Sequence, residues 1–367
     1  MLILWSLLAA LLLFFGQRML YKHRWFQMLK VSICFDSPTI TEGETVTLTE
    51  RFENRKLLPL PYFSYRYIVN RNYAVVREAR GGDAEVQRRI ALPARRSVRC
   101  RTRLNGLTRG VYGLTDVTVS AADLLYTVHP YEQVRSPARL IVYPRKLPVQ
   151  KLSLPCQQLL GDVLTRRYAQ EDPFQLRGIR QYEIYDSMRN VNWKASARTG
   201  ELKVNQHEYT TNEALLILLD LGAGTEPQRE KLISLASSLS RFFLHRGVMV
   251  ALLSNMRSCV TGKAVRVLPG GSLRQQTVID TALAQIKLAM DPVSDFPSFL
   301  RTVPVSTLRR STTVVLSADP TDGPMTAYRT LLGDQHGYLI STANEQLAEA
   351  PGVTIYVWDE EKGEVRV

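Results

Sequence analysis

The chain begins with an apolar run that is followed by cations. Residues 2–15 (LILWSLLAALLLFF) are apolar apart from Ser6, and the run reaches Leu20 if the charge of Arg18 snorkels towards the interface. About 20 such residues in a helix cross a hydrocarbon core about 30 Å thick. A cleaved signal peptide, one alternative, carries its cations before the apolar run, and a buried helix is the other. The pattern predicts a membrane helix within residues 1–30.

The cations that follow the helix predict its orientation. They lie in residues 18–30 (RMLYKHRWFQMLK). Under the positive-inside rule, cations next to a membrane helix stay on the cytoplasmic side. We therefore expect a single-pass protein of the cell membrane, with the bulk of the chain in the cytoplasm.

Residues 31–148 show the period of two that is typical of strands. The clearest segments are TVTLTERFEN (45–54), LPLPYFSYRYIV (58–69) and SVRCRTRL (97–104). In the last segment the apolar side chains and Thr102 share one face, and three arginines share the other. Several short strands in succession predict a β-sandwich domain.

Residues 211–367 alternate apolar runs with amphipathic stretches. The runs at 214–222, 248–254, 312–319, 338–342 and 353–359 read as strands. The stretches at 227–247, 273–290 and 325–337 read as helices. This alternation predicts a doubly wound α/β domain. The chain as a whole is expected to be a multidomain β + α/β protein: a membrane helix, a β-sandwich, a connecting segment at 149–210 and the α/β domain.

The net charge bears on the class of binding partner, and the spacing of the cysteines bears on whether they form disulfides. The net charge of +13 calls for an acidic partner, which can be nucleic acid, anionic lipid or protein. Residues 86–115 hold eight arginines and no acidic residue, but Tyr112 is their only aromatic residue, which argues against nucleic acid. Two alternatives remain for these arginines: they bind anionic lipid headgroups, or they form a strand face that is simply exposed to solvent. The four cysteines lie far apart, which suits free buried thiols in a reducing compartment, with two long-range disulfides as the alternative.

One stretch, RGIRQYEIYDSMRNVNWKASARTG (177–200), concentrates arginines and aromatics. Asp186 can cap a helix that begins at Ser187, and Gly200 can end it. The stretch resembles the signature of the domain of unknown function 58 family, whose glycine before the aspartate is Tyr185 here. The matching positions are Arg180, Tyr182, Asp186, Arg189, Trp193, Ser196, Ala197 and Arg198. Residues 53–63 (ENRKLLPLPYF) and 108–127 (TRGVYGLTDVTVSAADLLYT) are also similar to the family, so the resemblance covers nearly the whole length.

The resemblance implies an architecture and a partner. Members of the family typically carry amino-terminal membrane helices, a β-sandwich, the signature and a domain resembling von Willebrand factor A. They are bacterial or archaeal proteins, often encoded beside a MoxR-type AAA+ ATPase. Such an ATPase is the expected partner of this chain.

The resemblance also implies a test for a metal site. Domains of the von Willebrand type bind Mg²⁺ through Asp-x-Ser-x-Ser, since this hard cation takes oxygen ligands. The equivalent stretch here is DLGAG (220–224), with glycine at both serine positions. Asp319 could join Asp220 at the same rim and hold Mg²⁺ weakly. We favour a degenerate site in which Asp220 caps the following loop, and we expect no cofactor.

Catalytic motifs are absent from the sequence. The five histidines have no metalloprotease or nucleophile-elbow context, and Gly262-Lys263 lacks the upstream glycine of a phosphate loop. Residues 269–272 (PGGS) read as a glycine turn with a serine cap. We therefore expect no enzymatic activity, although a hydrolase site assembled from distant residues stays open.

Two interpretations of the signature remain. In the first it is a structural clasp with Trp193 buried and Arg189 paired with Asp186 or a carbonyl. In the second, Arg180, Arg189 and Arg198 form an anion or partner site. The function we predict is a membrane-anchored adaptor that engages the ATPase near Asp220 and Asp319. The alternative is a metal- or ligand-binding sensor at the membrane.

Overall fold

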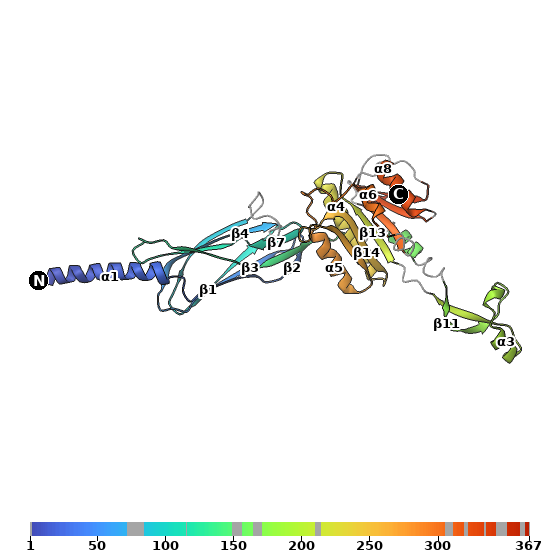
Figure 1. Ribbon diagram of the computed structural model, residues 1–367, viewed down its shortest axis with the longest axis horizontal. Helices are drawn as coiled ribbons and strands as arrows, with labels where there is room; N and C mark the ends of the chain where they lie inside the picture. Colours follow the sequence, from blue (N-terminus) through green and yellow to red (C-terminus); the bar gives the residue numbers. More distant parts are fainter. Residues whose placement is uncertain are drawn as a thin grey trace. The chain divides into compact units, whose positions relative to one another are not determined.

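The computed structural model describes residues 2–71, 84–114, 116–148, 156–163, 171–209, 214–304, 311–318, 322–333, 335–342, 351–359 and 364–366. The chain divides into two compact units (Figure 1). The amino-terminal unit contains residues 1–145 together with 258–262 and 283–287. The carboxy-terminal unit contains residues 146–257, 263–282 and 288–367. The molecule thus combines sheets and helices with an apolar helix at its amino terminus.

The first helix, α1, runs from Leu2 to Arg24. Its residues Ile3–Arg24 are long and apolar enough to cross a membrane, and the apolar window is not buried in the protein. The end of the helix is different, because the side chains of Tyr21 and Trp25 are buried in the core of the amino-terminal unit. The Tyr21 hydroxyl donates to the carbonyl of Pro59 at 2.6 Å. The last turns of α1 are therefore built into the folded unit.

The amino-terminal unit holds two sheets. The first is antiparallel and has the order β1 (Leu29–Phe35), β3 (Val46–Asn54), β6 (Ser97–Leu104). The second has the order β2 (Thr39–Thr41), β10 (Arg139–Tyr143), β7 (Gly110–Leu114), β4 (Leu60–Arg71), β8 (Val117–Ala122), β9 (Tyr131–Val134), with β5 (Ala84–Leu92) paired to β4. Phe52 of β3 packs on Phe63 and Tyr65 of β4, so the core lies between the sheets. The three strands that we singled out are confirmed as β3, β4 and β6.

The carboxy-terminal unit is built on a seven-stranded sheet. Its order is β15 (Ala264–Gly270), β14 (Met249–Arg257), β13 (Ala214–Asp220), β16 (Ser311–Ser317), β17 (Gly337–Ser341), β18 (Val353–Asp359), β19 (Glu364–Arg366). The run from β14 to β18 is parallel, and the two edge strands are antiparallel. The buried apolar runs of the sequence form these parallel strands, as predicted.

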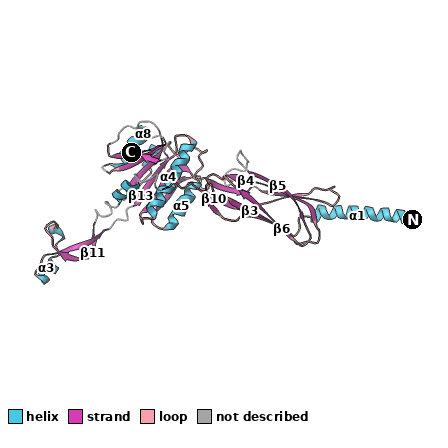
Figure 2. Cartoon of the chain, turned by 180° about the vertical axis from the view of Figure 1, so that it is seen from behind, coloured by secondary structure: helices cyan, strands magenta, loops and turns pink. Residues whose placement is uncertain are grey.

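Helices cover both faces of this sheet (Figures 1 and 2). They are α4 (Glu226–Leu244), α5 (Leu273–Ala284), α6 (Phe296–Arg301) and α8 (Asp322–Leu332). Leu216 and Leu218 of β13 belong to a core cluster with α6 and α8. Because side chains alternate along a strand, the other residues of β13 face α4.

The helix predicted at 273–290 is six residues shorter in the structure, where α5 ends at Ala284. Beyond Ala284 the backbone pairs with another segment instead: Ile286 forms an isolated β-bridge with Ser258, and the N–H of Cys259 donates to the carbonyl of Gln285 at 2.8 Å. Arg109, in the amino-terminal unit, donates to the carbonyls of Leu283 and Ile286 at 2.6 and 2.8 Å. Leu283 lies in the last turn of α5, and Ile286 follows the end of the helix by two residues. The short α6 and the edge strand β15 were not predicted, since neither shows a long periodic stripe.

Candidate functional site

The signature folds as a hairpin that carries two short helices. Strands β11 (Glu171–Gln181) and β12 (Lys203–Tyr209) pair antiparallel, and the 3₁₀ helix η2 (Met188–Asn190) and α3 (Trp193–Thr199) lie between them. The single helix predicted from Ser187 is wrong, because Val191 is extended and separates the two helices. Its predicted end is confirmed: Gly200 closes α3 in the left-handed conformation, with φ of 73°.

Arg180 and Asp186 form the central ion pair of the signature. The Arg180 guanidinium donates to both carboxylate oxygens of Asp186, at 2.8 and 2.5 Å. The backbone N–H of Glu183 donates to the same carboxylate at 2.8 Å. The hydrogen bond from Arg180, followed by that from Glu183, holds the pKa of Asp186 below its usual range. A bidentate pair of this kind fixes the direction of both side chains.

The ion pair gives the hairpin a dependence on pH in the acid range. Because the pKa of Asp186 is lower in the folded than in the unfolded chain, its stabilising contribution is complete above about pH 4. That contribution is lost as the pH falls through the folded-state pKa. We expect Arg180→Met to raise the pKa of Asp186, measured by NMR titration of its carboxyl group. Arg198→Met, which alters an exposed cation of the same segment, is the control. Equal Asp186 pKa values in both variants would contradict the pairing.

A second set of polar contacts fastens α3 to β12. The side chain of Asn192 caps the helix: its oxygen accepts from the N–H of Ala195 at 2.9 Å. Its side-chain NH₂ donates to the side-chain oxygen of Asn205 at 2.7 Å. The buried Ser196 hydroxyl donates to the Asn192 backbone carbonyl at 2.8 Å and accepts from the Lys203 N–H at 2.8 Å. Together with the Arg180–Asp186 pair, these contacts form what we call the polar clasp.

The aromatic part of the signature is exposed. Trp193 is 64% exposed and Tyr185 is 94% exposed, and Ile179, Ile184 and Met188 are exposed as well. The prediction that Trp193 is buried is therefore wrong. The helix is held by the hydrogen bonds of Asn192 and Ser196, so no apolar pocket for the indole is needed.

Of the remaining signature residues, Tyr182 makes a backbone contact, and Arg189 and Arg198 expose their side chains. The N–H of Tyr182 donates to the carbonyl of Leu202 at 2.9 Å and extends the hairpin. The side chains of Arg189 and Arg198 are exposed, and neither has a recorded hydrogen bond or ion pair within the described part of the chain. The sequence predicted a pairing of Arg189 with Asp186 or a carbonyl; in the described residues the carboxylate of Asp186 accepts from Arg180 and from the N–H of Glu183 instead.

Tyr185 replaces the family's glycine without strain. The turn from Glu183 to Asp186 is closed by the N–H of Asp186, which donates to the carbonyl of Glu183 at 2.9 Å. The non-glycine residues with positive φ in the described ranges are Met28, Arg95 and Tyr126, so Tyr185 keeps an ordinary backbone conformation. The position can therefore carry a large side chain, and this chain uses it to expose a tyrosine.

The rim predicted around Asp220 lies at the carboxyl ends of β13, β14 and β16. Asp220 is 4% exposed. Its carboxylate accepts from the Asn255 side-chain amide at 2.8 Å, from the Gly222 N–H at 3.1 Å and from the Ser317 hydroxyl at 3.1 Å. Asn255 in turn accepts from the Leu221 N–H at 3.2 Å. The carboxylate thus ties the loop after β13 to the two neighbouring strands.

These residues do not fit a magnesium ion. Mg²⁺ takes about six oxygen ligands, whereas two of the three recorded donors to Asp220 are N–H groups. A serine at position 224 is excluded, because its Cβ would lie 2.3 Å from that of Ala318 and φ at Gly224 is 87°. The described residues include no cluster of three or more potential metal ligands. Asp319, the second predicted ligand, lies outside the described residues.

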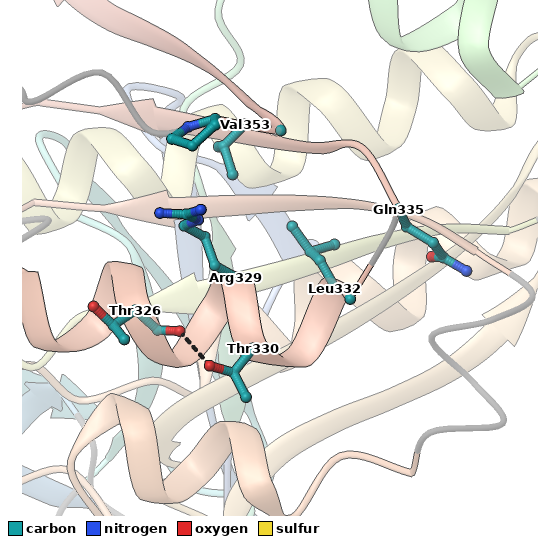
Figure 3. Close-up of a pocket in the computed structure, with 9 residues that line it drawn as sticks. Thr326, Arg329, Thr330, Leu332, Gln335 and Val353 are labelled. Atoms are coloured by element: carbon teal, nitrogen blue, oxygen red, sulfur yellow. Dashed lines mark hydrogen bonds between the residues drawn. The ribbon is translucent and has the colours of Figure 1, made fainter.

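A separate cavity of about 300 Å³ lies between α8 and the start of β18 (Figure 3). Its lining includes Thr326, Arg329, Thr330 and Val353. The Thr330 hydroxyl is turned to its own helix and donates to the carbonyl of Thr326 at 2.8 Å. Among the described residues of the lining, Arg329 is the only charged side chain.

Comparison with known proteins identifies a family. The sequence profile described as Protein of unknown function DUF58 matches residues 178–367, which is more than half of the chain. The chain belongs to this family. The matched region holds the polar clasp and the Asp220 rim. The amino-terminal segments at 53–63 and 108–127, which also resemble the family, lie outside it. No curated protein shows significant similarity to the chain.

Solved structures align only with low scores. The alkylpurine DNA glycosylase AlkC of Pseudomonas fluorescens is 15% identical over 29% of this chain and 30% of its own, with a TM-score of 0.20. The CARDB domain of a Pyrococcus furiosus protein is 11% identical over 32% of this chain and 96% of its own, with a TM-score of 0.21. The sporulation control protein Spo0M of Bacillus subtilis is 11% identical over 42% of this chain and 58% of its own, with a TM-score of 0.19. Scores this low carry no argument about this chain.

Two residues of the candidate site were missed by the sequence analysis. Asn192 had a local signal, because an asparagine directly before a helical stretch is a common cap. Asn255 had none, since its contact with Asp220 depends on the register between two parallel strands.

Proposed function

We propose that the chain is a membrane-anchored adaptor without enzymatic activity of its own. It works with a MoxR-type AAA+ ATPase in the assembly or maturation of a protein complex. One observation carries the proposal: the apolar side chains of Ile184, Tyr185 and Trp193 are exposed on a backbone that the polar clasp holds in place. Large exposed apolar side chains on an ordered segment are typical of binding surfaces.

The amino terminus supports the anchoring part of the proposal. Residues Ile3–Arg24 meet the length and composition of a membrane span. Tyr21 and Trp25 pack into the core of the amino-terminal unit, so removal of the helix as a leader would also remove core side chains. The cations at its end favour a cytoplasmic location for the rest of the chain.

The finer fold assignment is part of the proposal. We assign the two sheets of the amino-terminal unit to a β-sandwich, supported by the side chains of β3 that pack on β4. We assign the carboxy-terminal unit to the von Willebrand factor A type, supported by its parallel run from β14 to β18. Asp220 at the end of β13 occupies the position where such domains carry their metal-binding aspartate.

We place the binding surface on the signature rather than on the rim. The rim was the predicted interface, but the Asp220 carboxylate is buried and receives hydrogen bonds from within its own unit. The signature instead offers apolar side chains together with the exposed cations Arg189 and Arg198. A partner with an apolar groove and acidic rim would match both.

The proposal is tested by affinity purification of the intact chain from native membranes, with quantification of any AAA+ ATPase that co-elutes. The double variant Ile184→Ser with Tyr185→Ser removes apolar side chains outside the polar clasp. We expect it to reduce recovery of the ATPase about tenfold, as loss of a binding hot spot does. The control is Leu268→Ser, which removes an equally exposed apolar side chain from β15.

Recovery of the ATPase with the double variant at the parental level would refute the signature as the binding surface. Absence of any ATPase from the parental eluate, with the chain folded by circular dichroism, would refute the partner itself.

A further inference from the structure

The end of α1 lies against two loops of the amino-terminal unit (Figure 1). The Gln17 side-chain amide donates to Asp123 at 3.5 Å, and the Tyr21 hydroxyl donates to the carbonyl of Pro59 at 2.6 Å. Lys56, in the same loop as Pro59, donates to the backbone carbonyls of Arg24 and Gln27, each at 3.4 Å. The loops at 55–59 and 123–128 are therefore fixed to the helix at its last two turns.

The loop at 123–128 has a rigid backbone. The buried carboxylate of Asp123 accepts from the N–H and hydroxyl of Thr127 and from the N–H of Val128, at 2.5, 2.7 and 3.0 Å. Tyr126 is held in the left-handed region with φ of 59°, where a non-glycine residue costs free energy. This arrangement leaves the side chains of Leu124 and Leu125 more than half exposed.

The neighbouring loop exposes apolar side chains as well. Leu57 is 72% exposed and Met28 is 68% exposed. The N–H of Arg55 donates to the carbonyl of Met28 at 3.2 Å, which joins the two chain segments. We call Met28, Leu57, Leu124 and Leu125 the collar.

The contacts with α1 set the depth of the collar relative to a bilayer. Gln17 and Tyr21 follow Ile3 by 14 and 18 residues, which is about 21 and 27 Å along a helix axis. A hydrocarbon core is about 30 Å thick. If α1 spans the core from Ile3, then loops that touch Gln17 and Tyr21 lie within about 9 Å of the boundary between hydrocarbon and headgroups.

We infer that the collar inserts into the interfacial layer of the same bilayer that α1 spans. The inference rests on the anchoring part of the proposed function. Its occupant is lipid, because the collar is continuous with the apolar surface of α1 and is fixed to it by Gln17, Tyr21 and Lys56. Four exposed apolar side chains gain free energy on leaving water, and Tyr126 beside them is of the type that favours this layer. The collar would hold the amino-terminal unit at the membrane surface in addition to the single helix.

The inference is tested by fluorescence quenching in two kinds of phosphatidylcholine vesicle, with acyl chains brominated near the glycerol for labels at position 125 and Cys34, and near the chain ends for a label at position 11. The intact chain carries one cysteine label that is sensitive to its surroundings. The background is Cys34→Ser with Cys100→Ser, which removes the accessible thiols, and the label is placed at Leu125→Cys or, in α1, at Leu11→Cys. The control is the exposed native Cys34 in a Cys100→Ser chain. It lies six residues beyond Met28, about 20 Å along extended β1.

The expected result is quenching of about twofold or more at positions 11 and 125, with none at Cys34. Quenching at 11 without quenching at 125 overturns the collar but leaves the membrane anchor intact. Equal quenching at 125 and Cys34 also overturns the collar, since the whole unit would then lie against lipid. No quenching at 11 refutes the anchor, and the collar with it.

Discussion

Replacement of Asp220 by alanine should lower the free energy of unfolding of the carboxy-terminal unit by about 4 kcal/mol. The carboxylate is buried and accepts from Asn255, Gly222 and Ser317. Alanine would leave these donors without their partner in a place that water scarcely reaches. Each buried donor left unsatisfied costs about 1–3 kcal/mol, so the loss is larger than that of a typical substitution.

The measurement is hydrogen exchange of the peptide that contains β13, in the intact chain, because the two units need not unfold together. Ser317→Ala is the matched control, since it removes one of the three donors and leaves the carboxylate in place. We expect it to cost about 1 kcal/mol. Addition of Mg²⁺ should protect β13 equally little in the parent and in Asp220→Ala. Exchange in Asp220→Ala at the parental rate would contradict the structural role. Protection by Mg²⁺ in the parent alone would instead support a metal site.

Replacement of Arg109 by methionine should destabilise the amino-terminal unit by about 2–4 kcal/mol. The side chain is 1% exposed, and its guanidinium donates to the carbonyls of Leu283 and Ile286. Methionine fills much of the space but supplies no donor, so the carbonyls of Leu283 and Ile286 lose this partner.

The unfolding of the Arg109 variant is followed by hydrogen exchange of β7 and of residues 283–287, which belong to the same unit. Arg103→Met on β6 is the control, since Arg103 is exposed and a surface change of this kind costs less than about 0.5 kcal/mol. Equal exchange in the two variants would show that the contacts of Arg109 contribute nothing to stability.

Elements that depend on local pattern were predictable from the sequence. The apolar helix, the strands β3, β4 and β6, and the parallel strands of the carboxy-terminal unit each show their period in a single stretch of chain. The glycine at the end of α3 was predictable for the same reason, because a left-handed helix end is a local requirement.

Features that depend on distant contacts were not predictable. Arg109 contacts the carbonyl of Leu283 from 174 residues away, and the loop after β13 is tied to Asn255 by the register of two parallel strands. In the signature, the clasp interpretation placed Trp193 in a buried position. The actual anchor is Ser196, whose hydroxyl joins α3 to β12. A sequence period cannot distinguish a helix held by hydrogen bonds from one held by an apolar face.

The clasp and the binding-surface interpretations of the signature are therefore compatible. The polar residues Arg180, Asp186 and Ser196 order the backbone, and the exposed Tyr185 and Trp193 remain available to a partner. The sequence placed Arg180 in the binding-site interpretation, whereas its bidentate pair with Asp186 makes it part of the clasp.

The most direct test of the adaptor proposal is site-specific photo-crosslinking from position 185 in native membranes. A photoreactive phenylalanine in place of Tyr185 retains a large exposed aromatic side chain, and the same group at Leu268 serves as the control. The account predicts a crosslink from position 185 to an AAA+ ATPase that is absent from position 268. A chain that is folded and present in the membrane, yet crosslinks to no such ATPase from position 185, would contradict it.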